Sequence, residues 1–311
     1  MNYRHRFHAG GFADVFKHAI LALVIESLKA KDKPFIVLDT HAGVGRYDLE
    51  SEEARRTKEY EGGIARLFGV SDAPAALAPY LAAVRALNPD GRLHWYPGSP
   101  RLARSLLRPG DRLVAVELHP DDAKLLAAEF ARDRQVKVHH LDGYQALKAF
   151  LPPMPRRGLV LIDPPFEEKD EFDRMVSGLK AAHRRWATGI YLLWYPVKDR
   201  AEVRRFHRAL SASGIGSMMA VELSVEPKEK AGVLTGCGLI LVNPPFGLDD
   251  TLKRVLPDLA RRLAVGGSGG WAIEPLASDG SEPRRAPPAS SPRIPGTSRR
   301  APRGGPARRP G

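Results

Sequence analysis

The residues best suited to chemistry are Asp163-Pro164-Pro165-Phe166, which directly follow the apolar run of residues 159–162. The run predicts a buried strand, and two prolines must end it because proline has no backbone N–H to donate. A carboxylate, an outward-facing carbonyl and an aromatic ring would then stand together at a strand end. These groups suit an exocyclic amine on a flat base, with two acceptors and a stacking surface. A strand stopped by prolines needs no chemistry, so the tetrapeptide alone is a weak signal.

A second signal is a glycine loop after an earlier predicted strand. Residues 34–39 form a short apolar run that ends in Asp39, and Thr40-His41-Ala42-Gly43-Val44-Gly45 follows. Apolar strand, acid and paired glycines are typical of the nucleotide loop of an open parallel sheet, where glycine lets the backbone approach a ligand. The loop lacks the G-x-G-x-x-G fingerprint, and no acid ends a strand about twenty residues later. A dinucleotide is therefore not the expected ligand.

Two further acids follow predicted strands. Glu117 ends the run of residues 113–117, and a carboxylate there commonly binds a ribose diol. Asp142, followed by Gly143, comes after residues 136–141 and could accept a hydrogen bond from an adenine amino group. Glycine loop, ribose acid, adenine acid and Asp-Pro-Pro-Phe occur in the chain order expected for a methyltransferase that uses S-adenosylmethionine (SAM).

With these residues in place, the chain resembles the RlmJ family of 23S ribosomal RNA adenine-N6 methyltransferases. The resemblance extends from Tyr3 to about Val265. The segments that carry it are Tyr3-Arg4-His5-Arg6-Phe7-His8-Ala9-Gly10, Ala13-Asp14-Val15, Lys17-His18, Leu38-Asp39-Thr40-His41-Ala42-Gly43, Tyr96-Pro97-Gly98-Ser99-Pro100, Glu117-Leu118-His119-Pro120, Asp142-Gly143, Asp163-Pro164-Pro165, Ala187-Thr188-Gly189-Ile190-Tyr191 and Leu193-Trp194-Tyr195-Pro196. The first and the fifth of these segments are specific to this family and not to methyltransferases at large.

The resemblance implies a fold, a reaction and a set of site residues. The fold would be α/β, a Rossmann-like class I SAM-dependent methyltransferase with a seven-stranded, mostly parallel sheet and an inserted small helical subdomain. The reaction would be methylation of 23S rRNA at N6 of one adenine, adenine-2030 in the family's rRNA numbering. The cofactor site would be lined by His18, His41, Gly43, Ser99, Glu117, Asp142, Gly143 and Asp163. Asp163 would also be the catalytic acceptor, acting with Pro164 and Phe166. Members of the family carry tyrosine where this chain has Phe166; stacking survives that change, whereas a phenol hydrogen bond does not.

The N-terminal segment is the expected contact to the substrate. Tyr3, Arg4, His5 and Arg6 precede a predicted helix that would line the cofactor site, so the segment could cover a base turned out of its RNA, with the arginines near phosphates. An N-terminal aromatic pair such as Tyr3 and Phe7 more often only fastens the first helix. The resemblance favours the substrate role, because this block is its most distinctive part.

Composition is consistent with this interpretation. The 311 residues suffice for one large α/β domain, and the excess of 48 Lys and Arg over 36 Asp and Glu suggests a polyanionic partner. The single cysteine, Cys237, excludes a disulfide framework, a cysteine-rich zinc site and the cysteine nucleophile of cytosine-C5 methyltransferases. No apolar run is long enough to span a membrane, and the N-terminus lacks a signal-peptide core. We expect a cytoplasmic, monomeric protein with no metal and no membrane association.

The pattern along the chain divides it into a domain and a tail. Residues 12–30 have helical apolar spacing, and residues 50–95 look like an inserted helical subdomain. The insertion carries a charged set that could face RNA, although a charge run is more often just a solvated face. That set is Arg55, Arg56, Lys58 and Arg66. We predict a methyltransferase domain over residues 1–265 and a disordered Pro/Arg/Gly-rich tail over residues 266–311, which has too few apolar residues to offset its ordering entropy.

Two competing sites need consideration. Asn243-Pro244-Pro245-Phe246 also follows a predicted strand, and Asn-Pro-Pro-aromatic loops are catalytic in glutamine and some adenine methyltransferases. The catalytic strand should come directly after the one leading to Asp142, which favours Asp163. A metal site is not expected, since the adjacent His139 and His140 would point to opposite faces of a strand and the other histidines lack acids or cysteines at ligand spacing.

Three hypotheses remain open from the sequence. The leading one is an RNA adenine-N6 methyltransferase with 23S rRNA as its partner. A DNA adenine-N6 or cytosine-N4 methyltransferase would use the same loop chemistry. The third is a non-catalytic RNA-binding protein on a methyltransferase fold, against which the intact Asp163, Glu117 and Asp142 argue.

Overall fold

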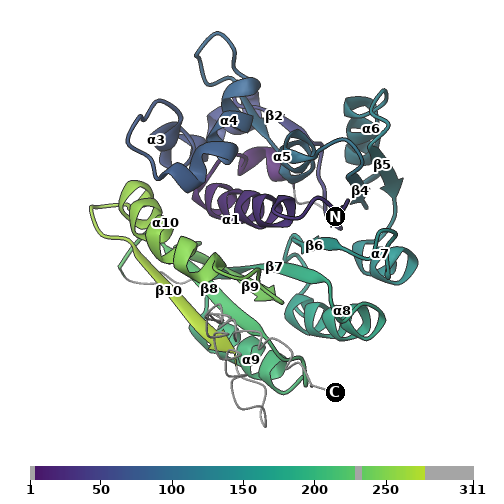
Figure 1. Ribbon diagram of the computed structural model, residues 1–311. Helices are drawn as coiled ribbons and strands as arrows, with labels where there is room; N and C mark the ends of the chain where they lie inside the picture. The colour runs from purple at the N-terminus through teal and green to yellow at the C-terminus, as the bar shows by residue number, and fades with distance from the viewer. Residues whose placement is uncertain (1–3, 228–232, 277–311) are drawn as a thin grey trace, which may run out of the picture. The chain divides into compact units, whose positions relative to one another are not determined.

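The computed structural model describes residues 4–227 and 233–276, and a central β-sheet organises them (Figure 1). The strands of this sheet are β1 Ile36–Asp39, β4 Arg112–Glu117, β5 Val136–His140, β6 Gly158–Ile162, β7 Ile190–Val197, β8 Met218–Ser224, β9 Gly236–Val242 and β10 Gly270–Leu276. They are hydrogen-bonded in the order β10-β8-β9-β7-β6-β1-β4-β5. The predicted α/β fold with a mostly parallel sheet is confirmed.

Strand direction determines which loops can meet. β1 pairs in parallel with both β4 and β6, so the chain order reverses on either side of β1. Ligands of open α/β sheets bind beyond the carboxyl ends of the strands at such a switch point. β9 runs antiparallel to both β7 and β8. The carboxyl end of β9 therefore lies at the opposite edge of the sheet from those of β1, β4 and β6.

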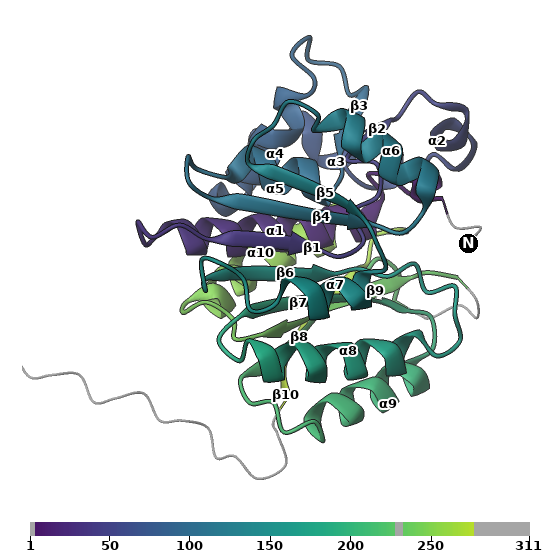
Figure 2. The same ribbon diagram turned by 90° about the vertical axis from the view of Figure 1, so that its right-hand side faces the viewer.

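Helices cover both faces of the sheet (Figure 2). One core contains the buried side chains of α1 Phe12–Lys29, α4 Ala78–Ala86, α5 Ser99–Leu106 and α10 Leu248–Leu263, and the other those of α7 Gly143–Phe150, α8 Glu171–Arg185 and α9 Arg200–Ser211. α6 Pro120–Glu129 connects β4 to β5. The apolar spacing predicted α1 to within a residue, and its Phe16 and Ile20 are fully buried.

The predicted helical insertion lies between β1 and α5. Its elements are β2 Arg46–Asp48, α2 Glu52–Thr57, the 3₁₀ turn η2 Glu59–Gly62, α3 Ala65–Phe68, the 3₁₀ turn η3 Ala75–Leu77, α4 and β3 Trp95–Pro97. β2 and β3 pair antiparallel, and the Gly98 amide donates to the Gly45 carbonyl at 2.9 Å. The insertion therefore begins and ends beside the glycine loop. This brings Gly98 and the adjacent Ser99 to Gly45, although more than fifty residues separate them in sequence.

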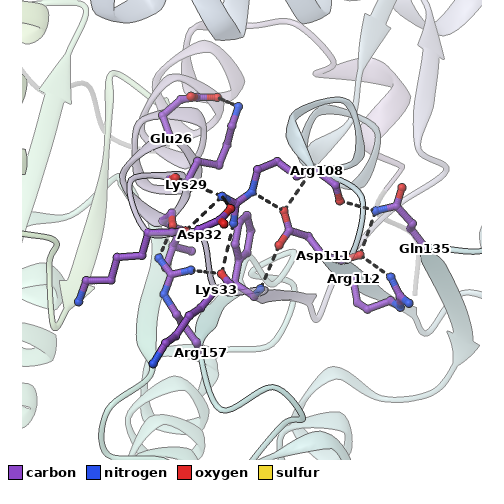
Figure 3. Close-up of polar contacts among 12 residues, drawn as sticks. Glu26, Lys29, Asp32, Lys33, Arg108, Asp111, Arg112, Gln135 and Arg157 are labelled. Atoms are coloured by element: carbon purple, nitrogen blue, oxygen red, sulfur yellow. Dashed lines mark hydrogen bonds and ion pairs between the residues drawn. The ribbon is translucent and has the colours of Figure 1, made fainter.

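A cationic network closes the opposite, amino-terminal edge of the sheet (Figure 3). The Arg108 guanidinium donates to three backbone carbonyls within residues 29–33 at 3.1–3.2 Å. Arg157 donates to the Lys33 carbonyl at 2.6 Å. Both guanidinium groups lie over the Phe35 ring, 5.6 and 5.7 Å from its centroid. The end of α1 is thereby fixed to the beginning of β1.

Two sequence predictions about the sheet need correction. It has eight strands and not seven, because β10 pairs antiparallel with β8 along Gly270–Leu276. The predicted domain boundary at 265 consequently falls too early, as Leu276 is buried and Ile273 packs against the core. The glycines before β10 are turn residues, with Gly266 and Gly267 at positive φ, so composition misplaced the boundary. Residues 277–311, which include most of the predicted tail, lie outside the described residues.

The two possible boundaries predict different truncation results. Ending the chain after Leu276 should leave the melting temperature nearly unchanged, because the removed residues are poor in apolar side chains. Ending it after Val265 also removes β10, which costs at least about 3 kcal/mol of apolar burial and lowers the melting temperature by roughly 6–12 °C. Calorimetry of both truncated proteins checks this, and equal melting temperatures would show that β10 contributes nothing.

Candidate active site

A cavity of about 520 Å³ opens at the carboxyl edge of the parallel strands. Its walls come from the N-terminal segment, the beginning of α1, the loop after β1, the ends of β4, β6 and β7, and the insertion. This volume is in the usual range for sites that bind small molecules and cofactors. The loop after β6 and the glycine loop after β1 both line it.

The Asp-Pro-Pro-Phe loop leaves β6 and enters the cavity. Asp163, Pro164 and Phe166 all line it, with Pro164 buried and the other two partly exposed. Phe166 has a φ of 53°, a left-handed conformation that non-glycine residues adopt at an energetic cost. Its ring meets Phe172 and Trp194 edge-on, with centroids 5.0 and 5.9 Å away. The surrounding aromatic rings hold the strained loop in this form.

A buried lysine connects the Asp-Pro-Pro-Phe loop to α1. The Lys17 Nζ lies 2.5 Å from Asp163 Oδ2 and 2.9 Å from Asp14 Oδ1, and Lys17 is only 4% exposed. Burial opposes the charge of Lys17, but the two carboxylates outweigh it and raise its pKa well above the usual range. Lys17 is therefore a cation shared between two carboxylates.

Asp14 links this lysine to the N-terminal segment. Asp14 Oδ2 lies 2.9 Å from His5 Nε2 and accepts a hydrogen bond of 3.0 Å from the Gly10 amide. Burial raises the pKa of Asp14, but His5 and Lys17 more than offset this and hold it well below the usual range. A chain of contacts thus runs from His5 through Asp14 and Lys17 to Asp163.

Glu117 organises the other half of the cavity. One of its carboxylate oxygens accepts from the Gly43 amide at 2.8 Å and the other from the His119 amide at 2.7 Å. Gly43 has a φ of 61°, and a Cβ there would lie 2.1 Å from the Tyr47 hydroxyl, so the position requires glycine. Burial raises the pKa of Glu117. The carboxylate is fixed against the glycine loop and retains lone pairs for a ligand.

Two neutral histidines line the same cavity. Thr40 Oγ1 donates to the Leu161 carbonyl, so the contact of 2.8 Å between Thr40 Oγ1 and His41 Nδ1 is donated by the imidazole, which leaves Nε2 as an acceptor. His18 Nδ1 lies 2.8 Å from the Tyr96 hydroxyl, and its buried Nε2 has no hydrogen-bond partner among the described residues. Burial lowers the pKa of His18 to about 3 and that of His41 to about 4.

These pKa values predict distinct titrations. His18 and His41 should stay neutral between about pH 5 and 8, because charging a buried imidazole without a new partner is unfavourable. His8 should titrate above its usual pKa of 6.5, since its hydrogen bond to Glu59 favours the charged form. Imidazole chemical shifts followed by NMR across this range check both statements. A midpoint near 6.5 for His41 would contradict the geometry described for its ring.

Comparison with known proteins identifies the family. A family model described as ribosomal RNA large subunit methyltransferase D, RlmJ, matches residues 32–276, well over half of the chain. The chain belongs to this family.

Two relatives are each named ribosomal RNA large subunit methyltransferase J. The protein of Escherichia coli (strain K12) is 50% identical over 269 residues, covering 86% of this chain and 96% of the relative. That of Haemophilus influenzae is 44% identical over 275 residues, covering 88% and 98%. The crystal structure of a Legionella pneumophila protein matches with a TM-score of 0.80 and 37% identity, covering 86% of this chain and 98% of that one.

The structure brings together most of the site residues suggested by the family resemblance. The cavity is lined by His5, His18, His41, Gly43, Ser99, Glu117, Asp163, Pro164 and Phe166. Arg4, Arg6, Asp142 and Gly143 do not line it. Tyr3, the expected RNA contact, lies outside the described residues.

The residues outside the cavity have visible structural partners. Arg4 and Arg6 both donate to Asp122 Oδ1, at 3.1 and 3.3 Å, and so fasten the N-terminal segment to α6. Asp142 caps α7 through the Gln145 amide at 2.9 Å. Gly143 packs behind His41, where a Cβ would lie 2.7 Å from the imidazole. Asp142 therefore caps the start of α7, and Gly143 at that start packs against the His41 imidazole.

The second proline loop lies at the wrong edge of the sheet. Because β9 is antiparallel, Asn243 emerges at the amino-terminal edge of the parallel strands, away from the cavity. Its side-chain amide donates to the carbonyls of Ala187 and Gly189, both at 2.8 Å. Asn243 thus fixes the turn before β7, and Phe246 is fully exposed.

Sequence reasoning missed three residues of the site. The family resemblance includes Lys17 and Asp14 without assigning them a role, yet Lys17 contacts the Asp163 carboxylate and Asp14 holds Lys17. A charged pair three residues apart within an otherwise apolar helix would have been the signal, because buried charges are rarely found without a partner. Asp39 was noted only as a strand end. Burial raises the pKa of Asp39 to about 7, and its Oδ1 accepts a hydrogen bond of 3.3 Å from the His41 amide.

The structure describes residues 4–227 and 233–276. In that part of the chain, no cluster of three or more His, Cys, Asp or Glu side chains could hold a metal ion. Within the same residues, no helix is both long and apolar enough to cross a bilayer.

Proposed function

We propose that this protein transfers a methyl group from SAM to N6 of one adenine in 23S rRNA, the adenine numbered 2030 in the family. The observation that carries the proposal is that one cavity holds both the Asp163-Pro164 acceptor pair and the loop of Gly43 against Glu117. The membership of the RlmJ family and the names of the relatives support rRNA as the substrate.

The polar groups that line the cavity match the hydrogen-bonding groups of SAM. Glu117 would accept from the ribose hydroxyls, and Gly43 lets the backbone come close to them. His41 Nε2 is a free acceptor, and the partnerless His18 Nε2 would gain a partner from a bound ligand. When bound, SAM supplies an activated sulfonium methyl group.

The protein's own groups would orient the amine. Adenine N6 is a weak nucleophile because its lone pair is delocalised into the ring. The Asp163 carboxylate and the Pro164 carbonyl would accept hydrogen bonds from its two N–H groups, direct the lone pair at the methyl group and stabilise the positive charge that develops on nitrogen. As the bond from sulfur to the methyl carbon breaks and the bond from N6 forms, N6 would lose one proton, which Asp163 would take after the transfer. Lys17 occupies Asp163 Oδ2 in this structure, so the amine must share or displace that contact. Asp14 remains to neutralise the lysine.

The adenine must leave its stack to reach these acceptors. A base inside a helix presents no accessible lone pair, so enzymes that modify bases use single strands or turn the nucleotide outward. Phe166 lines the cavity beside the acceptors and offers a stacking surface in place of the lost neighbours. We expect an unpaired or readily unpaired adenine in the target RNA.

Nucleoside analysis tests the proposal. The protein is incubated with SAM and either a 23S rRNA fragment containing the target adenine or duplex DNA, and the digested nucleosides are separated. We expect N6-methyladenosine at a single position of the RNA. Equal or faster methylation of DNA would favour a DNA adenine-N6 methyltransferase, and a methylated cytosine would favour cytosine-N4 chemistry. Failure to bind SAM in a titration would favour the non-catalytic RNA-binding alternative.

A further inference from the structure

Two lysines border the cavity from separate parts of the fold. Lys58 ends α2 in the insertion, and Lys198 follows β7; both line the cavity and both are exposed. Among the residues that the structure describes, Lys198 has no ion-pair partner, and Lys58 has only Glu61 at 3.9 Å. An exposed pair of that length holds a lysine weakly. Both ammonium groups are therefore available to a ligand.

The two lysines belong to one electrostatic neighbourhood. Glu59, directly after Lys58, pairs with His8 at 2.8 Å, and the positive charge of Lys198 acts on the same His8 ring. Lys58 and Lys198 thus flank the His8 and Glu59 pair. The acids at this border are Glu59, which His8 already contacts, and Glu226. The imidazole of His8 adds a third basic group to the same border.

The other basic residues nearby are already engaged. Arg4 and Arg6 both donate to Asp122. Arg66, which the sequence suggested as RNA-facing, donates to the carbonyls of Arg262 and Ala264 at 3.0 and 2.6 Å. Of the cavity-lining residues that the structure describes, Lys58 and Lys198 are therefore the exposed cations.

A base inside the cavity leaves its ribose and both flanking phosphates at the border. Phosphates are bound mainly by lysine and arginine, and such contacts fix the position of the nucleic acid without reading its sequence. We propose that Lys58 and Lys198 bind the phosphates on either side of the target adenosine and hold the RNA across the cavity. This inference rests on the proposed function and adds to it the residues that position the substrate backbone.

Salt dependence of RNA binding tests the proposal. The full-length protein with SAM is titrated with a short RNA containing the target adenine at several salt concentrations, as wild type, Lys58→Gln, Lys198→Gln and Lys198→Arg. Each Gln variant should lower the slope of log affinity against log salt by about one, and Lys198→Arg should retain it. Most of the loss in kcat/KM should fall on KM for RNA. Lys180→Gln, the same charge change on α8 outside the cavity, is the control.

The outcomes separate the two proposals. Slopes for both Gln variants equal to that of Lys180→Gln would overturn the phosphate contacts while methylation by the wild type still stands. A wild type that binds RNA with the full slope, loses slope in the Gln variants and yields no methylated adenine would support the contacts and overturn the proposed reaction. Unchanged SAM affinity in each variant shows that the fold and the cofactor site are intact.

Discussion

Replacing Asp163 with alanine should reduce methyl transfer on the order of a hundredfold or more, the scale for losing one preorganised polar group at a reacting centre. In the proposed reaction, Asp163 and the Pro164 carbonyl are the two acceptors for the N6 amine, and the Pro164 carbonyl alone would not direct the lone pair. SAM affinity should remain close to that of the wild type, because Glu117 and Gly43 form a separate part of the cavity. Single-turnover rates with a saturating RNA fragment measure the loss.

Asn243→Ala is the matched control for this experiment. It alters the same position of an equivalent proline loop, but at the edge of the sheet away from the cavity. It removes two hydrogen bonds to backbone carbonyls, so it should cost about 1–3 kcal/mol of stability and little activity. Near wild-type turnover in Asp163→Ala together with an inactive Asn243→Ala would move the active site to the other loop.

Lys17→Met should both destabilise the fold and reduce transfer. The substitution keeps the length of the side chain but leaves Asp14 and Asp163 without their shared cation. Removing one partner of a buried ion pair typically costs about 3–5 kcal/mol, and the remaining contact of Asp14 with His5 places this case at the lower end. Urea unfolding monitored by circular dichroism measures the free energy.

The loss of unfolding free energy in Lys17→Met should depend on pH in a defined direction. In the wild type, the lowered pKa of Asp14 gives stability above the carboxyl's ordinary pKa, and this stability is lost as pH falls from that value through the lowered pKa of the folded state. Without Lys17, burial favours the protonated carboxyl, so the deficit of Lys17→Met should be largest at neutral pH and narrow as pH falls. Lys29→Met removes the exposed pair with Glu26 on the same helix and should cost below about 1 kcal/mol. Equal losses in the two variants would mean that Lys17 is not a buried, shared cation.

Local patterns predicted most of the sheet but not its short or edge strands. β1, β4, β6 and β9 each contain an apolar run that turn residues delimit, and β5 lies within the predicted strand of residues 136–141. β2 and β3 have three residues each, and β10 has a glycine and a proline within it. Such strands form only when a neighbouring strand pairs with them. The sequence of one segment does not indicate which other strand will pair with it.

The same limit applies to the site. Asp163, Glu117 and Gly43 follow strands, so the periodicity that predicts the strands also predicts their place at one edge. The contact of Lys17 with Asp163 joins residues 146 apart in the chain, and that of Arg4 with Asp122 joins residues 118 apart. No spacing rule reaches over such distances. The direction of β9, which removes Asn243 from the cavity, also follows from pairing and not from its own residues.

The contacts of Arg108 and Arg157 with the end of α1 have a consequence for the chemistry at the other edge. Lys17 and Lys29 lie on one uninterrupted helix, about 18 Å apart at 1.5 Å per residue. A helix is stiff along its axis, so a displacement of residue 29 reaches Lys17 at nearly full size. The stiffness of α1 thus couples the Lys17 ammonium group beside Asp163 to the contacts of Arg108 and Arg157 at the far end of the helix. The length of α1 and the contacts that fix its end therefore help to position the Lys17 ammonium group beside Asp163.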